Sequence, residues 1–119
     1  METRKRHAAL FDALTRLTHV PDAHVAKGLL ELTEAIEFEF RLADERMEAA
    51  GCPGLHAQRE WRARMLGALH RAAPSATSGN MRDIRHMVAM LPYWLYDHFS
   101  TIEAVLPANH PACPATVWH

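Results

Sequence analysis

Apolar positions recur at intervals of three and four residues through most of the chain, which is typical of α-helices with one buried face. The pattern predicts four helices, over about residues 3–18, 23–49, 54–72 and 80–106. The strict apolar–polar alternation of a half-buried strand does not occur over any comparable length. Four long helices joined by short links predict an all-α fold, an up-down-up-down four-helix bundle.

Residues that interrupt helices separate these four segments. Asp22 follows Pro21 and is predicted to be the N-cap of the second helix, because its carboxylate can accept from free backbone N–H groups. Gly51 and Pro53 end that helix. The segment "APSATSGN", residues 73–80, is predicted to be a loop between the third and fourth helices.

Each predicted helix has one face that should be buried in the bundle. These inward positions are His7, Leu10, Phe11, Leu14 and Leu17; Val25, Leu29, Leu32, Ile36, Phe40, Ala43 and Met47; Leu55, Gln58, Arg62, Met65, Leu66 and Leu69; and Ile84, Val88, Leu91, Leu95, His98 and Ile102. Glu39 lies between Ile36 and Ala43 on the same stripe. An acid, an amide and an arginine at core positions need an explanation, because buried charges require partners.

Length and composition indicate one soluble domain. The 119 residues divide into a bundle over 1–106 and a proline-rich tail, 107–119, which is expected to dock on the bundle. The net charge of −1 gives no reason to expect binding to nucleic acid or to an anionic membrane. No apolar run approaches the ~20 residues of a membrane span, and none follows the first charges as a signal peptide would, so we expect a cytoplasmic protein. We expect the protein to bind another protein or a small ligand, which the sequence does not identify. The sequence is compatible with both a monomer and a homo-oligomer.

Four short motifs, in order, resemble those of the bacterial hemerythrins, the HHE cation-binding family. They are "RHAALF" in the first helix, "EFRLADERM" in the second, the turn "GCP", and "WLYDHFSTIE" in the fourth. The resemblance extends from Arg6 to Leu106 and implies a hemerythrin-like four-helix bundle. In that family, five histidines and two bridging carboxylates hold two irons that bind oxygen.

The metal ligands of the family are only partly present in this sequence. His7 and His98 keep the family's residue type, and Glu103 stands where the family has a bridging aspartate. Glu39 replaces the histidine of the second helix, and Ala43 replaces its bridging glutamate. Gln58 and Arg62 occupy the positions of the HxxxH pair in the third helix. The resemblance therefore implies the fold more strongly than it implies oxygen binding.

Arg62 suggests what replaced the iron. A guanidinium stays protonated, so we expect it to supply the positive charge of the lost metal and to pair with Glu39 or Glu103. The predicted function is a binding or regulatory module with no cofactor. The alternative is a non-haem iron protein that binds O2 or NO, or handles iron, with one or two ions at His7, Glu39, His98 and Glu103. No nucleophile or substrate site is specified, so an enzyme is not predicted.

A second group of metal-ligating residues is expected at one end of the bundle. The turn after the second helix and the C-terminal tail should meet there, which brings Cys52 and His56 near His110 and Cys113. Two cysteines and two histidines are a zinc ligand set. The competing interpretation is a pair of reduced thiols, the usual state of cysteine in the cytoplasm.

Overall fold

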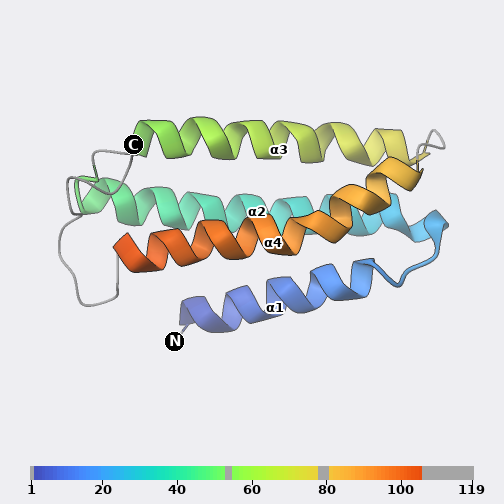
Figure 1. The fold of residues 1–119 in the computed structure, drawn as a ribbon, viewed down its shortest axis with the longest axis horizontal. Helices are drawn as coiled ribbons and strands as arrows, with labels where there is room; N and C mark the ends of the chain where they lie inside the picture. The colour runs from blue at the N-terminus through green and yellow to red at the C-terminus, as the bar shows by residue number, and fades with distance from the viewer. Residues whose placement is uncertain (1, 53–54, 78–80, 106–119) are drawn as a thin grey trace.

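The computed structural model describes residues 2–52, 55–77 and 81–105 of the chain (Figure 1). This part consists of four α-helices: α1 (Glu2–Leu17), α2 (Asp22–Ala49), α3 (Leu55–Thr77) and α4 (Met81–Val105). Each helix runs antiparallel to the next, and α1 contacts α2, α2 contacts α3, and α4 contacts both α3 and α1. The predicted all-α four-helix bundle is confirmed. The C-terminal tail lies outside the described residues.

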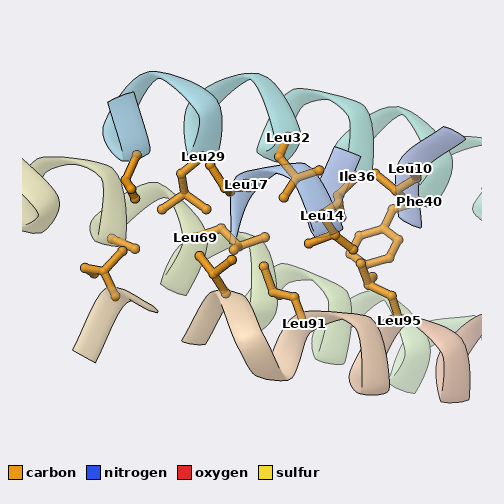
Figure 2. Close-up of a cluster of buried hydrophobic side chains, with 14 of the residues drawn as sticks. Leu10, Leu14, Leu17, Leu29, Leu32, Ile36, Phe40, Leu69, Leu91 and Leu95 are labelled. Carbon is orange, nitrogen blue, oxygen red and sulfur yellow. The ribbon is translucent and has the colours of Figure 1, made fainter. Parts of the chain in front are cut away.

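The hydrophobic core runs along the middle of the bundle (Figure 2). Every position predicted to face inward on α2 and α4 is buried, as are Leu10, Leu14 and Leu17 of α1. On α3 only Arg62 and Leu69 of the predicted positions are buried, and the remainder are half-buried. A smaller apolar cluster of Ala43, Met47, Cys52 and Ile102 lies toward the C-terminal end of α2. Helical periodicity thus located most of the core.

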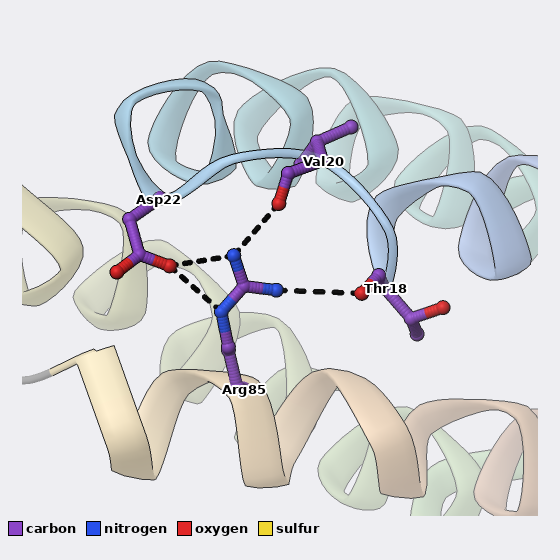
Figure 3. Close-up of polar contacts among 4 residues, drawn as sticks. All are labelled: Thr18, Val20, Asp22 and Arg85. Atoms are coloured by element: carbon purple, nitrogen blue, oxygen red, sulfur yellow. Dashed lines mark hydrogen bonds and ion pairs between the residues drawn. The ribbon is translucent and has the colours of Figure 1, made fainter.

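The connection between α1 and α2 differs from the prediction that Asp22 caps α2 (Figure 3). Pro21 is the N-cap residue, without a side-chain hydrogen bond, and Asp22 is the first residue of the helix. Arg85 of α4 holds the Asp22 carboxylate instead, with Nε and Nη2 donating to Oδ1 at 2.9 and 2.6 Å. The same guanidinium donates to the carbonyl oxygens of Val20 and Thr18. The Asp22 carboxylate therefore binds Arg85 of α4 and does not cap α2.

Two prolines lie inside helices. The prediction that residues 73–80 form a loop is wrong in part, because α3 continues through Pro74 to Thr77. Pro74 is exposed and lies in the last turns of α3, where the loss of one backbone hydrogen bond interrupts little of the helix. Pro92 lies inside α4, which changes direction part-way along its length, as expected for a proline-containing helix. In the described ranges, no helix combines the length and the apolar character needed to cross a membrane.

Candidate functional site

The polar residues of the core form two neighbouring groups, and the first surrounds Glu39 of α2. Arg6 Nε donates to Glu39 Oε2 at 2.9 Å, and His7 Nε2 lies 3.3 Å from Glu39 Oε1. The His7 ring stacks on Phe99 of α4, with ring centres 3.9 Å apart. A cavity of about 20 Å³, room for one water molecule, adjoins these residues. The buried carboxylate of Glu39 therefore has a cationic partner on α1.

The second group is centred on Arg62 of α3, whose side chain is only 2% exposed. Its Nη2 forms an ion pair with Oδ1 of Asp44, a side chain that is 27% exposed. Nε and Nη1 have no hydrogen-bond partner among the described residues. The guanidinium carbon lies 5.9 Å from the centre of the Phe40 ring, a distance typical of a cation–π contact. Arg62 is thus a buried cation with one charged partner and two nitrogens that have no hydrogen-bond partner among the described residues.

Of the two partners predicted for Arg62, Glu39 does not pair with it among the described residues, and the register of α2 against α3 explains why. The ion pairs Arg59–Glu48 and Arg62–Asp44 and the polar contact His70–Glu37 follow one another along the seam between these antiparallel helices. Asp44 also lies 3.6 Å from Arg59 Nε. Glu39 precedes Asp44 by five residues, which is about 7.5 Å along the helix axis. The other predicted partner, Glu103, has a side chain outside the described residues.

His98 of α4 connects the polar core to the aromatic residues around it. It is 6% exposed, stacks on Trp61 with ring centres 4.7 Å apart, and meets the Phe40 ring edge-on at 5.2 Å. Its Nε2 has no hydrogen-bond partner in the described part of the chain. Burial, together with the neighbouring charges of Arg62 and His7, lowers the pKa of His98 to about 3. The imidazole is therefore neutral at physiological pH.

The other described residues that the sequence singled out as possible metal ligands do not complete a metal centre. Ala43 belongs to the apolar cluster beside Met47, and Gln58 is half-buried on α3. Within the described ranges, no group of three or more histidine, cysteine or carboxylate side chains is arranged to hold a metal ion. Each polar group already contains a guanidinium, that of Arg6 or that of Arg62, and its positive charge repels a metal cation. The described residues therefore do not fit a di-iron centre.

The proposed zinc ligands are only partly in view. Cys52 is buried and takes part in a disulfide bond, and an oxidised sulfur is not the thiolate that zinc requires. His56 is exposed on α3, with Nε2 3.1 Å from Glu60 of the same helix. Cys113, the other cysteine of the chain, and His110 lie outside the described residues. The reduced state expected for Cys52 is not what the structure has.

Two residues that matter at this site were not identified from the sequence. Arg6 precedes the inward His7, and its long side chain reaches back to Glu39 from the helix flank. Asp44 follows the inward Ala43 and faces α3 from the edge of the predicted stripe. A search for acids and bases on the flanks of neighbouring helices would have found both.

No protein-family model, curated protein or solved structure gives a significant match to this chain.

Proposed function

We propose that this protein is a hemerythrin-like bundle in which ion pairs have replaced the di-iron site, and that it acts as a binding or regulatory module. The buried Arg62–Asp44 ion pair carries the proposal. The resemblance assigns Arg62 to a family ligand position, and a permanent cation there supplies charge that iron would otherwise bring. In the same way, Arg6 supplies the positive charge that balances Glu39, the acid that replaces the histidine of the second helix.

Metal analysis tests the proposal directly. The full chain, expressed in iron-rich medium, should purify colourless with well below one iron per chain, measured by elemental analysis and visible spectroscopy. The reason is that most family ligands are changed and both polar groups contain an arginine. Two irons per chain, with the charge-transfer absorption of an oxo-bridged pair, would overturn the proposal.

Restoring the ligands provides the positive control. The quadruple variant Glu39→His, Ala43→Glu, Gln58→His and Arg62→His rebuilds four family positions and should take up two irons. A matched triple variant that retains Arg62 should bind fewer, because the guanidinium still opposes the metal. Equal iron content in the triple and quadruple variants would show that Arg62 does not decide metal binding.

One observation favours a second function, a non-haem iron protein with an altered single-ion site. His7 Nε2 and Glu39 Oε1 lie 3.3 Å apart beside the cavity of about 20 Å³. One histidine and one carboxylate are suitable ligands for iron or manganese. Titration with ferrous iron distinguishes this function: stoichiometric binding in the unmodified chain, lost in His7→Ala, would support it and contradict the proposal above.

A further inference from the structure

A groove between α3 and α4 lies outside the hemerythrin-like polar core. Its volume is about 330 Å³, within the range of small-molecule sites. Seven of the lining side chains are apolar or aromatic, and one is charged; they are Trp61, Met65, Ala68, Leu69, Met87, Leu91, Trp94 and Arg64. Trp61 is 38% exposed and Trp94 is 42% exposed, which is high for tryptophan in a small bundle. This surface is suited to an apolar ligand.

Arg64, the charged residue of the lining, favours an apolar ligand that carries a negative charge. Arg64 is exposed, and the described residues include no ion-pair or hydrogen-bond partner for it. A guanidinium binds a carboxylate through two parallel N–H donors, and the apolar groove beside it lowers the local dielectric. The larger groove between α1 and α2 offers no such selection, because both basic and acidic side chains line it.

The length of the groove limits the size of the ligand. Because α3 and α4 run antiparallel, the two tryptophans lie toward one end and Leu69 and Met87 toward the other. Trp61 and Leu69 are eight residues apart, which is about 12 Å along α3. Side chains on a helix lean toward its N-terminus, so the long side chain of Arg64 can meet a carboxylate near the Trp61 end of this span. An extended alkyl chain is a zigzag that advances about 1.25 Å per carbon–carbon bond of about 1.5 Å, so roughly nine to eleven carbons have this length.

We propose that the α3–α4 groove binds a medium-chain fatty acid, with the alkyl chain along Met65, Leu69 and Leu91 and the carboxylate on Arg64. The methionines can adapt to a flexible chain, and the tryptophans cover its carboxyl end. This site deepens the proposed function, and rests on it, because it names a ligand for a bundle that acts by binding. It uses none of the family's metal-ligand positions.

Isothermal titration of the full chain with decanoate tests the proposal. Decanoate should bind with one site per chain, and decyltrimethylammonium, with the same chain and the opposite charge, should bind at least tenfold more weakly. Arg64→Gln should weaken decanoate binding about tenfold and remove most of the preference for the anion. Arg41→Gln is the matched control, because Arg41 is an exposed arginine on α2, outside the groove. Equal binding of the two amphiphiles, or no effect of Arg64→Gln, would overturn the proposal.

A groove-filling variant locates the site independently of charge. Ala68→Phe should abolish decanoate binding, while circular dichroism shows the same helical content as the unmodified chain. Unchanged binding in this variant would place the ligand elsewhere and overturn the proposal.

Sedimentation tests the main competing occupant, a second copy of the chain. A dimer that does not bind decanoate and that Ala68→Phe dissociates would assign the groove to that copy, and would also overturn the fatty-acid site. The metal analysis remains a separate test: a chain without iron that does not bind decanoate would contradict only the ligand assignment.

Discussion

Trp61 lies between the α3–α4 groove and the buried His98, with its indole lining the groove and stacked on the imidazole at 4.7 Å. The planes of the two rings are 26° apart, so the imidazole packs against one face of the indole. The proposed ligand site and the polar core of the bundle therefore share one side chain.

The stacking predicts that His98 affects decanoate binding without contacting the ligand. His98→Ala should lower the affinity several-fold, because the indole loses its support and the groove loses its shape. His98→Phe should retain the affinity, since a phenyl ring can stack in the same place. Calorimetric titration of the two variants provides the measurement, and equal affinities in both would contradict the coupling.

His98 should also make the bundle sensitive to acid. The unfolded chain binds a proton at this histidine near pH 6.5, whereas the lowered pKa of about 3 keeps the folded form neutral. Because the unfolded state then binds more protons, stability falls as the pH drops below about 6.5 and continues to fall toward 3. Between pH 7 and pH 5 this contribution amounts to about 2 kcal/mol, at about 1.36 kcal/mol per pH unit once the unfolded state is charged.

Urea denaturation at both pH values tests this linkage. The unmodified chain should lose about 2 kcal/mol more than His98→Phe between pH 7 and pH 5. The other histidines are common to both proteins, so their contributions cancel in the comparison. Parallel pH dependence of the two proteins would show that His98 is protonated in the folded state or that water reaches it.

The buried faces of α2 and α4 could be predicted from the sequence because these helices are long and their apolar stripes are regular. A stripe shows which residues point inward, but it does not show how far one helix is shifted along its neighbour. For that reason the stripe predicts that Arg62 lies in the core, but it does not show that Asp44 is its partner. The register of α2 against α3, set by packing along the whole seam, places Asp44 rather than Glu39 opposite Arg62.

Flank positions explain the other differences between prediction and structure. Arg6 belongs to a basic segment that suggests a solvated helix start, yet its long side chain reaches a buried acid. Asp22 has the sequence context of an N-cap, but Arg85, more than sixty residues away, binds its carboxylate. Local sequence does not reveal such distant partners. Arg64 and the groove beside it likewise depend on how α3 packs against α4.

Two helical glycines should respond in opposite ways to the same substitution. A Cβ on Gly67 would lie 3.2 Å from Nη1 at the far end of the exposed Arg71 side chain, which would have to shift by only a few tenths of an ångström. Gly67→Ala should therefore stabilise the protein by about 0.5–1 kcal/mol, the gain in helix propensity. A Cβ on Gly28 would lie 2.6 Å from Cδ1 of the buried Leu17.

The clash with Leu17 should outweigh the propensity gain at Gly28. Overpacking of a core costs about 1–3 kcal/mol, so Gly28→Ala should destabilise the protein by up to about 2 kcal/mol in net terms. Thermal denaturation of the two single variants measures the difference. A stabilised Gly28→Ala would mean that α1 and α2 separate easily at this point.

The last prediction concerns the unequal burial of the two partners in the Arg62–Asp44 pair. Asp44→Asn leaves a guanidinium that is 2% exposed without an anion, and should cost about 3 kcal/mol or more. Arg62→Met leaves a carboxylate that is 27% exposed, which water can reach, and should cost only about 1 kcal/mol. The double variant has no buried charge left unpaired at this position. It should be less destabilised than Asp44→Asn alone, by about 2 kcal/mol.

A double-mutant cycle in urea at pH 7 measures these differences, with Glu48→Gln as the matched control. Glu48 forms the neighbouring ion pair of the same seam with Arg59, but both side chains are exposed, so its loss should cost less than 1 kcal/mol. The main difference between the two pairs is the burial of the arginine, which is 2% exposed for Arg62 and 47% exposed for Arg59; Asp44 also lies 3.6 Å from Arg59. If Asp44→Asn is as mild as Glu48→Gln, water reaches the Arg62 guanidinium, and the position is open to a metal ion or a small anion. If Asp44→Asn is severe and the double variant recovers, a fixed internal cation is established at Arg62.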